Sequence, residues 1–183
     1  MTENQRPTMT ALNLALAAIF AALVFVATYS FVIYIPATSG YFNFGETIIY
    51  IAALMFGPFV GAFAGAGAAI ADVVVPGAAQ FAPGTLLIKG LEGATVGFIY
   101  IRLKKHMSNR SICSISSIVA GGSIMVSGYF FYEQIVLGYP FLAALVEIPI
   151  NILQLLVGLA VAVPIVNVIL HIFPQLESRR ARF

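Results

Sequence analysis

The chain has 183 residues, of which 61% are hydrophobic and only 9% are charged. A soluble domain of this composition would have too few charged side chains to hydrate its surface, so the sequence indicates an integral membrane protein. The length allows about six spans of ~20 residues with short loops. We therefore expect one membrane domain over residues 1–183, with no catalytic or nucleotide-binding module attached. The single cysteine, Cys113, excludes an intramolecular disulfide and a cysteine-based metal site.

Six apolar segments follow one another along the chain. The first covers about Met9–Tyr34, and its apolar stretch is too long for the core of a signal peptide. Pro36 and Gly40 then break the helix, so that Ile35–Asn43 forms an outer loop. The other helices are expected at Phe44–Phe56, Phe59–Val75, Pro83–Lys105, Ser111–Leu137 and Phe141–Phe173. The predicted fold is an all-α bundle of six transmembrane helices, the third of which is rich in Gly and Ala and suited to close packing in lipid.

The basic residues predict the orientation of this bundle. Eight of the nine Lys and Arg residues lie before the first helix, at the end of the fourth helix and in the connector after it, or at the end of the chain. The positive-inside rule places these regions together in the cytoplasm, which requires six spans and two cytoplasmic termini. Four acidic residues fall near the opposite ends of their helices: Glu46, Asp72, Glu133 and Glu147. We therefore expect the outer face to be acidic where it is charged.

Two charged residues lie inside the fourth helix. Lys89 and Glu92 are one turn apart and share a helix face, roughly 7 and 12 Å from a helix start at Gly84. A charge in a membrane costs on the order of 3 kcal/mol unless it meets a partner or a water-filled cavity, so such residues suggest a functional site. The alternative is that the two side chains only pair with each other or reach the outer interface.

A polar stripe runs along the sixth helix. Glu147, Asn151 and Gln154 recur at the spacing of one helix face, at roughly 9, 15 and 20 Å from Phe141. In lipid this face must point into the bundle, so the stripe predicts ligand contacts from the outer surface to about the midplane. The alternative is interhelical hydrogen bonding, worth only ~0.6 kcal/mol per bond.

Aromatic residues accompany these polar groups. Tyr132 and Glu133 lie near the outer end of the fifth helix, and Tyr41, Phe42 and Asn43 end the first outer loop. An apolar pocket with a few convergent polar groups and aromatic faces suits a small, flat heteroaromatic ligand. A belt of aromatic residues at the membrane interface is the alternative for part of this group. No His or Cys stands near the carboxylates and no catalytic constellation is present, so we expect neither a metal, nor a cofactor, nor an enzyme.

Two strings carry a family resemblance. They are YFNFGETIIYIAALMFGPFVGAFAGAGAAIADVV at Tyr41–Val74 and FAPGTLLIKGLEGATVGFIY at Phe81–Tyr100. They resemble the S-components, or substrate-binding subunits, of energy-coupling factor (ECF) vitamin transporters, in the riboflavin-type and hydroxymethylpyrimidine-type branch. One departure is Glu46, which stands where the family usually has Asp.

The resemblance implies a non-enzymatic subunit of the cell membrane that binds a vitamin or vitamin precursor from outside. It would pass this ligand to an ECF scaffold membrane subunit and two ATPase subunits, with the lipid bilayer as its other partner and no nucleic acid. The family's docking face corresponds to Ala11 and Ala15, whose small side chains would let a partner helix approach closely. Internal packing is the alternative for this stripe. The competing function is a stand-alone facilitator or proton-coupled transporter that uses Glu92 or Glu147.

Overall fold

The structure is a computed structural model, and it describes residues 11–176. These residues form six α-helices, one short two-stranded sheet and one turn of 3-10 helix. The helices are α1 (Ala11–Tyr29), α2 (Gly45–Phe56), α3 (Pro58–Val74), α4 (Ala82–Lys104), α5 (Arg110–Ile135) and α6 (Phe141–Ile172), and the 3-10 turn is η1 (Ala79–Phe81). The predicted all-helical architecture with six helices is therefore confirmed. The basic residues expected at the two ends of the chain lie outside the described residues.

The first helix ends earlier than predicted. It stops at Tyr29, and the next residues form strand β1 (Ile33–Tyr34), which pairs antiparallel with β2 (Tyr41–Phe42). β-branched and aromatic side chains favour such extended backbone over helix. The hairpin closes with a hydrogen bond from the Ile35 amide to the Gly40 carbonyl (2.7 Å). The prediction of a helix up to Tyr34 was wrong, and the expected outer loop is a hairpin.

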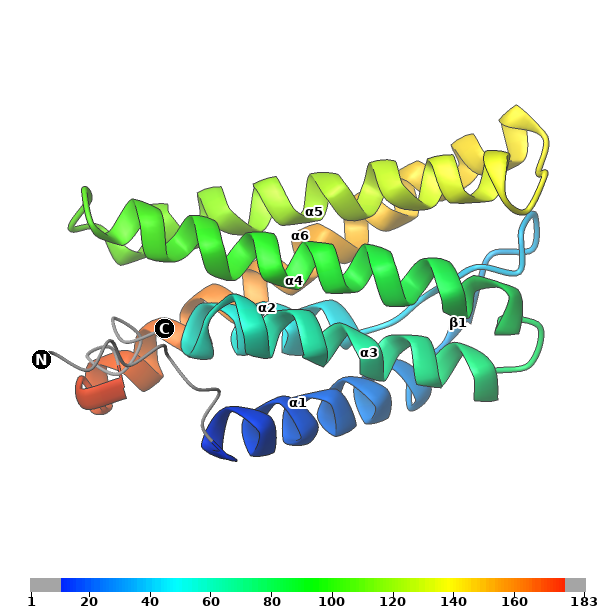
Figure 1. Ribbon diagram of the computed structural model, residues 1–183. Helices are drawn as coiled ribbons and strands as arrows, with labels where there is room; N and C mark the ends of the chain where they lie inside the picture. The colour runs from blue at the N-terminus through cyan, green and yellow to red at the C-terminus, as the bar shows by residue number, and fades with distance from the viewer. Residues whose placement is uncertain (1–10, 177–183) are drawn as a thin grey trace, which may run out of the picture.

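The helices lie along one common direction, and the loops gather at the two ends of the bundle (Figure 1). α3 packs between α1 and α4, α4 also packs on α5, and α2 packs against α6. The β1–β2 hairpin lies at one end, together with the α3–α4 and α5–α6 connections. The basic connector between α4 and α5 lies at the opposite end, near the start of α1 and the end of α6. The two ends of the bundle therefore differ in chemistry.

Glycines allow α3 and α4 to touch along their backbones. A Cβ atom at Gly61 would lie 2.6 Å from the Gly93 carbonyl oxygen, and one at Gly65 would lie 2.6 Å from the Lys89 carbonyl carbon. Only a residue without a side chain fits at such distances. This contact fixes the α4 backbone that carries Lys89 against α3.

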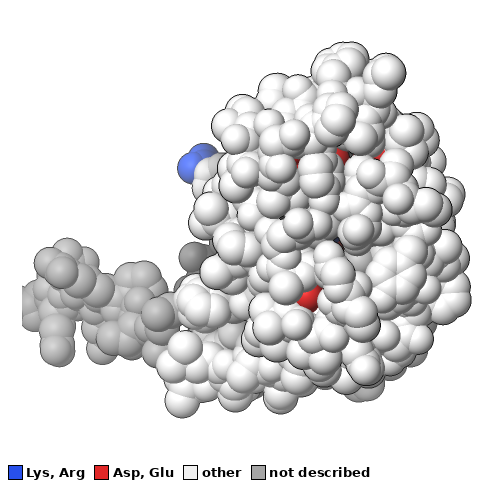
Figure 2. Space-filling model, turned by 90° about the vertical axis from the view of Figure 1, so that its right-hand side faces the viewer, with Lys and Arg blue, Asp and Glu red and all other residues white. Residues whose placement is uncertain are grey.

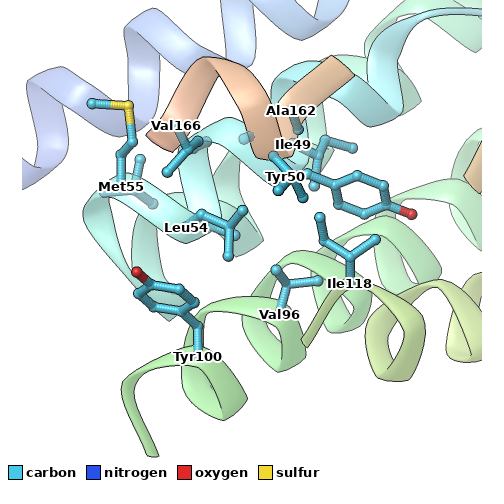
Figure 3. Packing of buried hydrophobic residues seen from close by; sticks show 14 of the residues in the cluster. Ile49, Tyr50, Leu54, Met55, Val96, Tyr100, Ile118, Ala162 and Val166 are labelled. Carbon is cyan, nitrogen blue, oxygen red and sulfur yellow. The ribbon is translucent and has the colours of Figure 1, made fainter. Parts of the chain in front are cut away.

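The apolar core lies between α2, α4, α5 and α6 (Figure 3), where Tyr50, Leu54, Val96 and Ile118 are fully buried. Large apolar side chains on the outer faces of the helices remain exposed, as expected for a surface that contacts lipid. Three helices, α1, α5 and α6, are individually long and apolar enough to cross a membrane. The crossing of all six helices and the position of the termini stay predictions.

Candidate functional site

A polar pocket lies beneath the hairpin, between the ends of the helices. The space between its lining atoms amounts to about 400 Å³, a figure that includes open solvent. Its lining comes from the hairpin, η1 and five helices: Thr28, Gly40, Tyr41, Asn43, Ala68, Asp72, Phe81, Thr85, Lys89, Tyr129, Glu147, Asn151 and Gln154. Six of these residues are among the ten predicted ligand contacts.

The predicted stripe of α6 forms one wall of the pocket. Glu147, Asn151 and Gln154 are all buried and all line it. The Gln154 amide is occupied by the protein itself, because its Oε1 accepts from the Asn43 amide (2.9 Å) and its Nε2 donates to Glu46 (3.0 Å). Within residues 11–176 the Asn151 side chain makes no hydrogen bond. Asn151 is therefore the stripe residue best placed to bond a ligand.

A buried charge network forms the floor. The Lys89 ammonium contacts the Glu46 carboxylate and lies 3.5 Å from Glu92 Oε2. The Tyr50 hydroxyl donates to Glu92 Oε1 (2.8 Å). The two predicted residues of α4 thus do pair with each other, but α2 supplies a second carboxylate that sequence spacing did not assign to Lys89. Lys89 lines the pocket, whereas Glu92 lies behind it.

Two further carboxyl groups lie close beneath the hairpin. The Tyr41 hydroxyl donates to Asp72 Oδ1 (2.5 Å), and the Thr38 hydroxyl donates to Glu147 Oε1. Glu133 is fully buried and interacts electrostatically with Glu147, but it does not line the pocket. The structure therefore places Asp72, which the sequence left without a role, in the site.

The hairpin lies over the pocket and is held there by hydrogen bonds to the Asp72 and Glu147 carboxylates. Burial and the adjacent Asp72 carboxylate raise the pKa of the Tyr41 hydroxyl, so it stays protonated and donates. Burial and the nearby Glu147 and Glu133 carboxylates also raise the pKa of Tyr139, whose hydroxyl donates to the Thr38 carbonyl (2.6 Å). The hairpin is thus tied to α3, to α6 and to the α5–α6 connection.

Gly40 makes this close approach possible. A Cβ atom at Gly40 would overlap the carboxyl group of Glu147. The hairpin backbone therefore rests directly on the acidic wall of the pocket.

The end of the bundle that carries the hairpin presents mostly uncharged side chains, with acidic atoms visible only in small recesses (Figure 2).

The aromatic lining differs from the predicted set. Tyr41 lines the pocket, but Phe42 packs against Phe31 and Phe44 instead. Tyr132 also lies outside the lining, and its hydroxyl donates to the Gln80 carbonyl (2.9 Å). Tyr129, one turn earlier on α5, takes the inner position. Neighbouring tyrosines on an aromatic-rich helix end give no sequence signal that tells the inner one from the outer one.

Other polar lining residues had no signal in the sequence. Thr28 comes from α1 and Thr85 from α4, where the Thr85 hydroxyl bonds Tyr129 (3.0 Å). A single threonine is common in membrane helices and forms no stripe. Among residues 11–176, no three His, Cys, Asp or Glu side chains are grouped as a metal ion would need.

The predicted docking face lies on the outer side of α1. Ala11 and Ala15 are exposed, as are Ala18 and Ala22, which continue the stripe. The opposite face of α1 is the one that packs on the bundle, through Asn13, Ala17, Val24 and Thr28. The alanine stripe is therefore open to a partner helix and is not used in internal packing.

Comparison with known proteins identifies the family. The family model described as "ECF-type riboflavin transporter, S component" matches residues 8–171, nearly the whole chain. The chain belongs to this family. Its members are components of transporters and form no enzyme class, so this ECF S-component is a membrane transport protein. The predicted family is confirmed.

Two individual relatives of this ECF S-component are informative. An uncharacterized protein from the gap 3′ region of Pyrococcus woesei is 44% identical over 96 residues, which cover 52% of this chain. The match spans 60% of that relative's own length. A solved chain, described under "Structure and mechanism of the S component of a bacterial ECF transporter", superposes with a TM-score of 0.65 at 17% identity. It covers 88% of this chain and 96% of the solved one, and at this identity it shows the common fold.

Proposed function

We propose that this S-component is the membrane-embedded substrate-binding subunit of an ECF-type importer. It captures a small vitamin or vitamin precursor with a flat heteroaromatic ring from outside the cell. The observation that carries this proposal is the covered pocket, in which charged, amide and tyrosine groups converge within an apolar bundle. A concave site of this kind, mostly apolar with a few convergent polar groups, suits a small polar molecule.

The proposed partners are an ECF scaffold membrane subunit and two ATPase subunits. The exposed alanine stripe on α1 supports a scaffold contact, because small side chains let a second helix approach closely in lipid. In this arrangement the pocket faces outward in the cell membrane and both termini lie in the cytoplasm. The separation between the hairpin end and the basic α4–α5 connector supports that orientation (Figure 1).

The orientation is tested by cysteine labelling in intact cells. Asn109 caps the start of α5 in the basic connector, where its side chain accepts from the Ile112 amide (3.1 Å). In a background where Cys113 is Ser, an Asn109→Cys variant should resist a membrane-impermeant thiol reagent until the cells are opened. A cysteine at Ser39, exposed in the hairpin, should react from outside as the matched control. Labelling of position 109 from outside would reverse the orientation.

Ligand binding is tested on the purified chain. Small molecules released by heat are identified by mass spectrometry, and the affinity for the released compound is measured by calorimetry. A vitamin-like heteroaromatic compound is the expected result. A chain that releases nothing and binds no vitamin would contradict the proposed function.

The Asn151→Leu variant should bind the released compound more weakly. Leucine is compatible with a membrane helix, so the fold should be kept. It leaves a polar group of the ligand without a hydrogen bond, which costs about 1–3 kcal/mol of binding free energy, or roughly 5- to 150-fold in affinity. Asn167→Leu is the matched control, since this amide of α6 bonds Ser111 (2.9 Å) away from the pocket. Equal affinity of the Asn151→Leu and unaltered proteins would make the stripe structural.

A further inference from the structure

The buried charges of the bundle are unequal. Among residues 11–176, five carboxyl groups and one lysine are buried: Glu46, Asp72, Glu92, Glu133, Glu147 and Lys89. Glu133 and Glu147 lie against each other, and two adjacent carboxyl groups share one proton. One lysine then faces four negative charges, a formal excess of three. Buried charges in a membrane need partners or a water-filled cavity. A positively charged group that is not one of these buried residues would therefore neutralise the excess negative charge.

Lys89 does not supply that charge to the pocket. Its ammonium is held between Glu46 and Glu92, both more than 98% buried. Two carboxylates against one ammonium already exceed the charge of the lysine. An anionic ligand would have to compete with both of them for the same group, so the site is poorly suited to anions.

The carboxylates that line the pocket have no cationic partner. Glu147 accepts from the neutral Thr38 hydroxyl, and Asp72 Oδ1 accepts from the neutral Tyr41 hydroxyl. Asp72 is 96% buried, and its Oδ2 has no donor in hydrogen-bond geometry among the described residues. The neighbouring Thr85 hydroxyl interacts with Asp72 as well as with Tyr129, and it too is a neutral group. A buried carboxylate oxygen without a donor carries a desolvation cost that a ligand donor would remove.

Two adjacent hairpin residues contact the Asp72 and Glu147 carboxylates. Gly40 rests on Glu147, and Tyr41 reaches Asp72 on the other side. The aromatic residues Tyr41 and Phe81 also line the pocket, while the ring of Tyr129 faces the Lys89 ammonium, 5.3 Å from the ring centre. Aromatic faces attract cations as well as stacking on flat rings. Acidic and aromatic groups therefore converge on one end of the cavity.

We infer that the ligand of this pocket is a flat organic cation, whose protonated or quaternary nitrogen binds between Asp72 and Glu147 under the hairpin. This inference rests on the proposed function and narrows its substrate class. Lys89 and its two carboxylates form the polar floor, while Asn151 meets a neutral polar edge of the ring. An organic cation fits better than a metal ion, since the described residues hold no group of three metal-type ligands.

The test uses the full chain purified in detergent. Compounds released by heat are identified by mass spectrometry, and calorimetry measures binding of three probes: thiamine, a cation, riboflavin, which is neutral, and nicotinate, an anion. We expect the released compound to carry a positive charge at neutral pH, and thiamine to bind more tightly than the other two probes. A neutral or anionic released compound, or preferential binding of riboflavin or nicotinate, would overturn the inference and leave the proposed function standing. No released compound and no binding of any probe would overturn both.

Two variants at one position separate charge from shape. Asp72→Asn keeps the shape and still accepts the Tyr41 hydrogen bond but loses the charge, so binding of the cation should weaken roughly 10- to 100-fold. Asp72→Glu keeps the charge and changes the shape, and it should weaken binding less. The reverse order, or unchanged affinity in Asp72→Asn, would contradict recognition of a cation. Thermal unfolding checks that both variants fold. If Asp72→Asn does not fold, Glu147→Gln is used in its place to remove one carboxylate charge from the pocket.

Discussion

The Ala15→Trp variant is expected to abolish uptake by the assembled transporter, while the isolated subunit still binds its ligand. Ala15 lies exposed on α1, on the side away from the packed face of that helix. A tryptophan there would hold a docked helix several ångströms too far away for close packing, yet it would meet only lipid in the free subunit. Uptake is measured in cells that produce all subunits, and binding is measured by calorimetry on the purified variant.

Leu23→Trp serves as the matched control. Leu23 is exposed on the same helix, 46% accessible, but lies roughly 80° around it from Ala15. We expect this variant to support normal uptake, since its side chain points to one side of the alanine stripe. Loss of ligand binding in the isolated Ala15→Trp protein would mean that the stripe packs internally. Normal uptake by the Ala15→Trp variant would show that Ala15 is not part of the docking face.

The second large effect is expected for Lys89→Met. Methionine preserves the length of the side chain but leaves Glu46 and Glu92 without a cation. Removal of one member of a buried ion pair costs about 3–5 kcal/mol, because the remaining charge stays buried without compensation. Both the free energy of unfolding in detergent and the affinity for the ligand should fall, since Lys89 also forms the pocket floor.

Lys105→Met is the control for this change. Lys105 is exposed at the end of α4, so its loss should change stability by no more than a few tenths of a kcal/mol. Unfolding is measured in mixed detergent for both variants. Equal stability of the two would show that the buried network contributes little, and the account of the pocket floor would need revision.

The sequence predicted the helices well because their signals are local. Length, apolar composition and Gly or Pro at the turns define five helices to within about two residues of the observed ends. The exception is the end of α1, where the residues from Phe31 to Tyr34 are as apolar as the helix before them. Their extended conformation depends on pairing with Tyr41–Phe42, and hydropathy carries no information about such pairing.

The site was predicted most fully where residues on one helix form a stripe, while Lys89 was found as a charge inside an apolar helix and Tyr41 and Asn43 from the end of the outer loop. Glu147, Asn151 and Gln154 were found in this way, because their spacing alone places them on one inward face. Single residues from different helices, such as Asp72 and Tyr129, reach the pocket only through the packing of α3, α4 and α5. The pairing of Glu46 with Lys89 likewise depends on how α2 meets α4.

The most direct test of the central claim measures what drives uptake. The compound released from the purified protein, in radiolabelled form, is supplied to cells that produce this chain with or without an ECF scaffold and its two ATPases. We predict uptake only with the complete set, lost when an ATPase is inactivated and unaffected when the proton gradient is collapsed at constant ATP. Uptake by the chain alone that stops when the proton gradient is collapsed would contradict the account and identify a stand-alone proton-coupled transporter.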